Sequence, residues 1–207
     1  MADSLEFSAL DSFQLDVLKE IGNIGAGNAA TALAKMLDKK IDMKVPQIKV
    51  MKFSEVSDVL GGAETQVVGL LLSVHGDING SMMFILDYQS AQLLVNILMG
   101  RPTRAELEYD EMTCSALKEI GNILAGSYLS ALSNLTNLKI MPGVPGLAID
   151  MAGAILSVPA IEFSKNSDTV LYIENEFTDG LDSVIGNLFL VPDEVSYVRL
   201  LHALGVV

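Results

Sequence analysis

The sequence has few of the residues from which independent catalytic centres are built. Its 207 residues include one cysteine (Cys114), two histidines (His75 and His202) and no tryptophan. A single thiol excludes an internal disulfide and any metal cage made of several thiolates. We expect Cys114 to be a small helix residue and both histidines to be structural, and we expect no metal site on this chain.

Positive charge is also scarce. Lysine and arginine total 13 against 26 acidic residues, so the net charge is −13, which opposes binding to nucleic acid and to anionic membranes. No apolar run approaches the roughly 20 residues of a membrane helix, and residues 1–6 lack the basic and apolar segments of a signal peptide. Half of the residues are hydrophobic, which excludes intrinsic disorder. The composition predicts a soluble cytoplasmic protein that binds no nucleic acid and does not insert into membranes.

The chain contains an internal repeat. Residues 18–27 read LKEIGNIGAG and residues 117–126 read LKEIGNILAG, with nine of ten positions identical. A weaker similarity links residues 81–100 with residues 186–205. These pairs indicate a tandem duplication. We predict a single domain over residues 1–207, built of two repeats at about 11–100 and 110–205.

Hydrophobic periodicity predicts the same order of elements in each repeat. Long helices are expected at 11–38 and 110–138, and closing amphipathic helices at 88–99 and 192–204. Strands are expected at 47–53, 66–75, 78–87, 146–151, 168–177 and 183–191, with short helices near 54–60 and 151–157. The fold class is therefore α+β: a duplicated, pseudo-two-fold α/β sandwich with two long helices on a mainly antiparallel sheet.

Turn and cap residues support these boundaries. Gly76-Asp77 and Asp179-Gly180 are typical of hairpin turns. Gly100 and Gly205 follow the two closing helices, where glycine favours the left-handed conformation that ends a helix. Pro192 is expected at the start of the second closing helix.

The two repeated helices each carry a polar stripe. Because a helix turns about 100° per residue, spacings of four, three and four keep side chains within about 60° of one another. The first stripe consists of Asp16, Glu20, Asn23 and Gly27, and the second of Ser115, Glu119, Asn122 and Gly126. The opposite sides are expected to face the core, with Leu18, Gly22, Gly25, Ala29 and Met36 in the first helix and Leu117, Gly121, Leu124 and Tyr128 in the second.

The paired Glu and Asn suit the positioning of water better than nucleophilic attack. No His, Cys or Lys cluster stands beside them as a general base, and di-iron helices use Glu-x-x-His rather than Glu-x-x-Asn. The order of Gly22, Gly25 and Gly27 does not match a dinucleotide-binding loop. A carboxamide donates and accepts hydrogen bonds, so it can orient an attacking water without titrating. A glutamate can anchor the helix to a cationic side chain of a partner.

One such pair would be typical of an ordinary solvated helix face, whereas its near-identical repetition indicates a functional surface. The stripe glycines, Gly27 and Gly126, leave two interpretations open. They can give a partner access to the Asn, or they can let the two helices pack together.

At these residues the sequence resembles the CheC/CheX/FliY family of chemotaxis phosphatases. The family signature is Asp or Ser, three residues, Glu, two residues, Asn, three residues and Gly. It is met by Asp16-Glu20-Asn23-Gly27 and again by Ser115-Glu119-Asn122-Gly126. Two intact copies in a chain of about 200 residues are similar to the CheC arrangement.

The resemblance implies a phosphatase that acts on CheY-P, the phosphorylated chemotaxis response regulator. Asn23 and Asn122 would orient the attacking water, and Glu20 and Glu119 would pair with a lysine of the partner. No cofactor is implied on this chain, because Mg²⁺ belongs to CheY. CheD, the receptor deamidase, is implied as a second partner. Two alternatives remain: a non-enzymatic interaction module that chiefly binds and regulates CheD or serves the flagellar switch, and a metal-dependent enzyme acting alone.

Overall fold

The two halves of the chain contain the same strands and α-helices in the same order. The computed structural model describes residues 12–38, 40–102, 105–106, 108–163, 169–178 and 183–205. The first half contains α1 (Ser12–Leu37), β1 (Asp42–Lys44), β2 (Ile48–Lys52), η2 (Phe53–Glu55), α2 (Val56–Val59), β3 (Gln66–Gly76), β4 (Gly80–Asp87) and α3 (Tyr88–Met99). The second contains α4 (Glu111–Thr136), β5 (Ile140–Pro142), β6 (Gly146–Met151), α5 (Ala152–Phe163), β7 (Thr169–Thr178), β8 (Ser183–Pro192) and α6 (Glu194–Ala203). This matching order confirms the duplication.

The halves exchange strands to build one antiparallel sheet. Its order is β1-β7-β8-β4-β3-β5, with β2 also paired to β7 and β6 to β3. We call β3–β4 and β7–β8 the two central hairpins. Strands β1 and β2 pair with β7 of the second hairpin, and strands β5 and β6 pair with β3 of the first. Reading the order from the opposite end exchanges every strand with its repeat, which places a pseudo-two-fold axis between β4 and β8. The predicted shared sheet is confirmed; that residues 1–207 form one domain stays a prediction.

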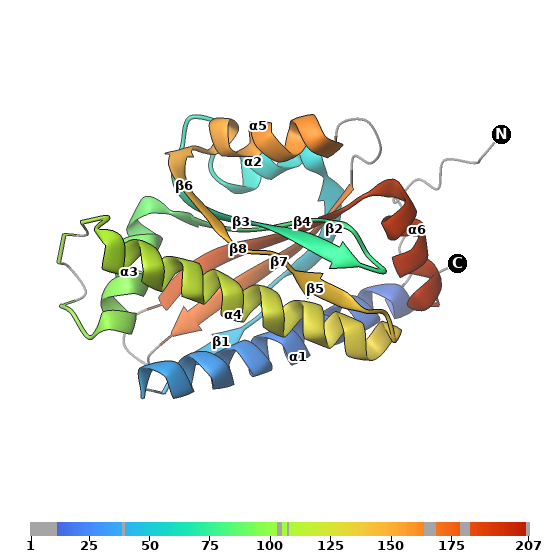
Figure 1. The fold of residues 1–207 in the computed structure, drawn as a ribbon, viewed down its shortest axis with the longest axis horizontal. Helices are drawn as coiled ribbons and strands as arrows, with labels where there is room; N and C mark the ends of the chain where they lie inside the picture. Colours follow the sequence, from blue (N-terminus) through green and yellow to red (C-terminus); the bar gives the residue numbers. More distant parts are fainter. Residues whose placement is uncertain are drawn as a thin grey trace.

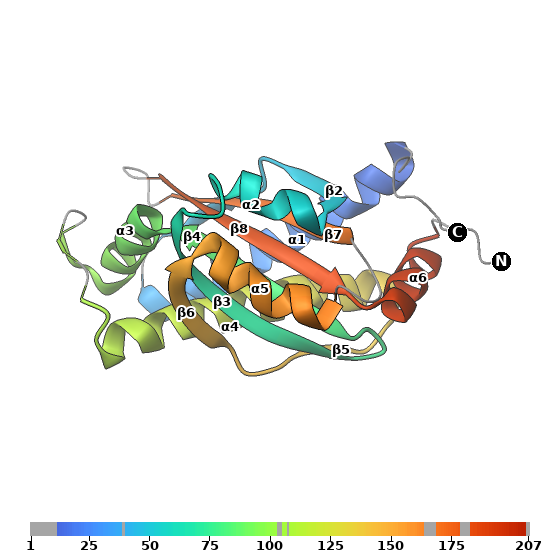
Figure 2. The same cartoon turned by 90° about the horizontal axis from the view of Figure 1, so that it is seen from above.

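Helices cover both faces of the sheet. Helices α1 and α4 lie side by side on one face, α2 and α5 cover the other, and α3 and α6 lie at opposite ends (Figures 1 and 2). The larger core fills the space under α1 and α4, where Leu33, Leu70 and Leu124 are fully buried. A smaller core under α2 and α5 contains Met83 and Phe189. The long helices are thus held by apolar burial on their inner sides.

Most predicted elements agree with the observed ones to within a few residues, but three details were wrong. Strands β1 and β5 were not predicted, because three residues are too few to show an alternating pattern. Pro192 is the last residue of β8 rather than the start of a helix, and Asp193 caps α6 instead. Met36, expected in the core, is 43% exposed because it lies in the last turn of α1, beyond the buried Leu33. The expected turn at 179–180 lies outside the described residues.

Aspartates begin three of the helices. The side chains of Asp87, Asp110 and Asp193 accept hydrogen bonds from backbone N–H groups three residues on, at Ser90, Thr113 and Ser196. Such caps satisfy N–H groups that the first helical turn leaves free. Gly100, with φ of 64°, and Gly205, with φ of 72°, follow α3 and α6 as expected.

Gly25 lets the two long helices approach closely. A Cβ atom at this position would overlap the ring of Tyr128 in α4, lying 2.7 Å from its Cε1. The Tyr128 hydroxyl donates a hydrogen bond to Asn175 in β7, and both residues are almost fully buried. The ring is therefore held by the helix backbone at one end and by this hydrogen bond at the other. The second repeat has Leu124 where the first has Gly25, so the tyrosine fills space that only a glycine leaves open.

We predict that Gly25→Ala lowers the free energy of unfolding. Overpacking against a fixed ring costs about 1–3 kcal/mol, and the better helix propensity of alanine returns only about 1 kcal/mol. The expected net change is a loss of up to about 2 kcal/mol, which can be measured by urea denaturation. Gly27→Ala is the matched control and should gain stability, because the added methyl group would meet no atom within 4 Å. Equal gains at both positions would contradict the packing argument.

Candidate functional site

Both polar stripes lie on the outer faces of α1 and α4. Glu20 and Asn23 are exposed on α1, and Glu119 and Asn122 are exposed on α4. Asp16, Ser115 and Gly27 are also exposed, and Gly126 is partly exposed. The opposite sides of the helices are buried, at Leu18, Ile21, Leu117 and Ile120 among others. The predicted division into a core side and a polar side is therefore present in both helices.

The long helices run in opposite directions. In Figure 1, α1 runs from right to left and α4 runs from left to right beside it, both on the same side of the sheet. The pseudo-two-fold relation therefore places the two stripes on one helical layer. Each stripe has a carboxylate and a carboxamide one helical turn apart, open to a partner.

The stripe glycines face empty space. A Cβ atom at Gly27 or Gly126 would meet nothing within 4 Å, whereas one at Gly22 would lie 2.8 Å from Ile48 Cδ1. The interpretation that Gly27 and Gly126 let the two helices pack together is therefore wrong. Gly25 is the glycine that allows this close packing. A glycine inside a helix costs about 0.8–1 kcal/mol relative to alanine, and among the residues that the structure describes no close packing contact at Gly27 or Gly126 requires one.

The two stripes differ at their first residue. Asp16 forms an ion pair with Lys19 at 3.3 Å, with both side chains largely exposed, so solvent screens it. Ser115 instead lines an open hollow of about 490 Å³ with Asp110, Glu111 and Met112. Met112 lies three residues before Ser115 and continues the same stripe, and its apolar side chain is 64% exposed. Sequence reasoning missed it, and extending the spacing one step towards the N-terminus would have found it.

The segments that carry the stripes match a known family. The profile of the CheC-like family matches residues 13–50 and 112–149. The CheY-P phosphatase CheC of Bacillus subtilis is 40% identical over 203 residues, which cover 96% of this chain and 97% of that protein. This chain belongs to the CheC-like family.

Other members of the wider group match this CheC-like chain in part or in fold. The CheY-P phosphatase CheX of Thermotoga maritima is 32% identical over 100 residues, covering 46% of this chain and 63% of that protein. The crystal structure of Thermotoga maritima FliY superposes with a TM-score of 0.73 at 25% identity, covering 94% of this chain and 99% of that chain. The duplicated CheC-like fold expected from the sequence is thereby confirmed.

The described residues contain neither a metal-binding cluster nor a membrane-spanning helix. Within the described ranges, no group of three or more His, Cys, Asp or Glu side chains is placed to hold a metal ion. In the same part of the chain, no helix is both long and apolar enough to cross a membrane.

Asp110 positions the first turn of α4, next to the second stripe. The hydrogen bond from the Thr113 backbone N–H lowers the pKa of this carboxyl, with a smaller contribution from Arg101. A lowered folded-state pKa means that the charged cap stabilises the fold above the ordinary aspartate pKa of about 3.9, and that this contribution is lost as the pH falls through the lower folded value.

We therefore predict that, as the pH falls below about 4, Asp110→Asn loses less stability than the native protein. Asparagine can still cap the helix but does not titrate. Acid denaturation followed by circular dichroism measures the difference. If the two proteins lost stability equally as the pH falls, Asp110 would not contribute to this pH dependence.

Proposed function

We propose that this CheC-like chain is a phosphatase that hydrolyses the aspartyl-phosphate of CheY-P. The observation that carries the proposal is the pair of matching exposed Glu–Asn stripes, each beside an open glycine. The 40% identity to a CheY-P phosphatase over nearly the whole chain supports the substrate. Each long helix would then serve as one site.

Each residue type has a distinct part in this reaction. The carboxamide of Asn23 or Asn122 would orient a water whose oxygen forms a bond to phosphorus as the bond to the aspartate oxygen breaks. The products are inorganic phosphate and the free CheY carboxylate. Glu20 or Glu119 would pair with a lysine of CheY and hold the helix in place. Mg²⁺ would be bound by CheY and would neutralise phosphate charge there, so this chain needs no cofactor of its own.

Phosphate release from CheY-P tests this function directly. Catalytic amounts of the chain, at one part in twenty of CheY-P, should accelerate release through many turnovers. An acceleration limited to one phosphate per chain, or none, would contradict an enzymatic role. Chelation of Mg²⁺ should abolish the acceleration because CheY loses its Mg²⁺. Metal analysis of the purified chain alone should therefore find no bound metal.

CheD is the second partner in this proposal, supported by family membership alone. A pull-down with CheD, run beside the phosphate-release assay, separates the enzyme from the non-enzymatic alternative. Binding of CheD or CheY-P without accelerated release would favour an interaction module. Release with or without CheD binding would favour the phosphatase.

A further inference from the structure

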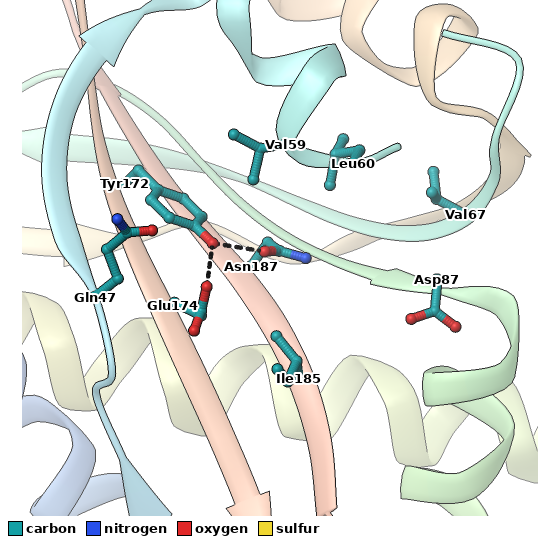
Figure 3. Close-up of a pocket in the computed structure, with 9 residues that line it drawn as sticks. All are labelled: Gln47, Val59, Leu60, Val67, Asp87, Tyr172, Glu174, Ile185 and Asn187. Carbon is teal, nitrogen blue, oxygen red and sulfur yellow. Dashed lines mark hydrogen bonds between the residues drawn. The ribbon is translucent and has the colours of Figure 1, made fainter. Parts of the chain in front are cut away.

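A second hollow lies on the opposite face of the sheet from the two stripes. Its volume is about 270 Å³, and it opens beside α2 over strands β7 and β8 (Figure 3). Its apolar lining comes from Val59 and Leu60 at the end of α2 and from Ile185 on β8 (Figure 3). The floor is polar, formed by Tyr172, Glu174 and Asn187. We call this hollow the Tyr172 pocket.

The polar floor has more hydrogen-bond acceptors than protons. The Tyr172 hydroxyl lies 3.1 Å from Glu174 Oε2 and 2.9 Å from Asn187 Oδ1 (Figure 3). The amide of Asn187 is oriented by donation from its Nδ2 to the Ile85 carbonyl at 3.3 Å. A phenol has one proton, so it can satisfy only one of the two oxygens at a time. Tyr172 itself is buried, but Glu174 and Asn187 are partly exposed, so the acceptor that the phenol leaves without a proton is open to the hollow.

Charge at the pocket also favours a cation. Glu174 and Asp87 both line it, and the chain as a whole has a net charge of −13. Lys49 lies over the face of the Tyr172 ring, with Nζ 5.3 Å from the ring centroid. The Tyr172 hydroxyl itself points towards Glu174 and Asn187 in the pocket (Figure 3). Burial and the nearby Glu174 raise the pKa of Tyr172, so its hydroxyl stays protonated and neutral.

The duplication shows that the fold does not require this polar floor. The N-cap aspartates Asp87 and Asp193 align the two central hairpins. In that alignment, the positions of Tyr172, Glu174 and Asn187 are occupied in the other half by Leu71, Ser73 and Ser81. The same sheet architecture is thus built without a phenol or a carboxylate at these positions. A role in ligand binding would account for their presence in one half only.

We propose that the Tyr172 pocket binds an ammonium or guanidinium group on a short aliphatic stem. The donors of the cation supply the protons that Glu174 and Asn187 lack, and the stem lies along Val59, Leu60 and Ile185. A volume of about 270 Å³ suits such a small group, because drug-sized ligands occupy about 300–1,000 Å³. The source is either a free small amine or a lysine or arginine side chain of a protein.

Titration of the ¹⁵N-labelled chain with butylammonium and butylguanidinium tests the proposal. Amide shifts are expected in β7 and β8, and they should weaken at high salt because the attraction is between charges. Neutral 1-butanol and anionic butyrate have the same stem and should not bind. Glu174→Gln should weaken binding by about tenfold or more, as expected for a lost charged hydrogen bond. Glu176→Gln is the matched control on the same strand and should bind like the native chain.

Three results would overturn the proposal: no shifts in β7 and β8, equal binding of 1-butanol, or unchanged binding to Glu174→Gln. Ile185→Phe provides a second variant, which fills the hollow and leaves the polar floor intact. It should also abolish binding, with melting temperatures confirming that each variant is folded. The peptide Gly-Gly-Arg-Gly identifies the source. Binding tighter than that of butylguanidinium supports a protein side chain, and weaker binding supports a free small cation.

Discussion

The Asn23→Ala, Asn122→Ala double variant is expected to release phosphate from CheY-P no faster than CheY-P does alone. In the proposed mechanism, alanine would leave no group to hold the attacking water at either site. Loss of one preorganised hydrogen-bonding group typically lowers a catalysed rate by about 100-fold or more. Both asparagines are exposed, and alanine is the better helix former, so the variant should fold at least as stably as the native chain. A time course of phosphate release, with circular dichroism melts of both proteins, measures both effects.

The helices provide a matched control for this variant. Asn28 on α1 and Asn134 on α4 are also exposed asparagines, but neither lies on a stripe. The Asn28→Ala, Asn134→Ala variant should keep the native rate. Each single stripe variant should keep the activity of the other site, which also shows how the two sites share the work. Full activity in the Asn23, Asn122 double variant would refute the water-orienting assignment.

Local periodicity was enough to predict where the site residues lie. The spacing of Glu20, Asn23 and Gly27 places them on one face of a helix, and the second copy is the reason for predicting that this face is more than a solvated one. The burial of Leu18 and Leu117 on the opposite sides agrees with that geometry. The repeat also predicted the pseudo-two-fold sheet, because two similar halves with unpaired strand edges bury them best against each other.

Features that depend on contacts distant in sequence could not be predicted. The pairing of β2 with β7 of the other half joins residues more than 100 positions apart, such as Ile48 and Ile173. The difference between Gly25 and Leu124 had no explanation until Tyr128 was seen to lie against Gly25 and to reach Asn175. The floor of the Tyr172 pocket was missed for the same reason, since Glu174 and Asn187 meet only through strand pairing.

The Gly27→Gln, Gly126→Gln double variant is expected to separate stability from activity. Glutamine is a good helix former and glycine is a poor one, so the two changes should raise the free energy of unfolding by about 1–1.5 kcal/mol. A Cβ atom at either position has no neighbour within 4 Å, so each new side chain can leave the helix without a clash at its first atom. They would instead fill the space beside Asn23 and Asn122 that CheY-P would enter in the proposed mechanism. Phosphate release should therefore fall by about tenfold or more, as expected for a contact surface disrupted at its centre.

Because stability is expected to rise while activity falls, this variant distinguishes a glycine needed for folding from one needed for a partner. A glycine kept for folding would lower stability when replaced, as predicted for Gly25, where Tyr128 occupies the space. A glycine kept for a partner would lower activity while stability rises. Urea denaturation and CheY-P decay, measured on the same preparations, report the two quantities independently. The corresponding alanine double variant should gain similar stability and lose less activity, because a methyl group extends less far from the helix. Native activity in the glutamine variant would mean that the partner approaches each stripe from another side, and the open space at Gly27 and Gly126 would then need a different explanation.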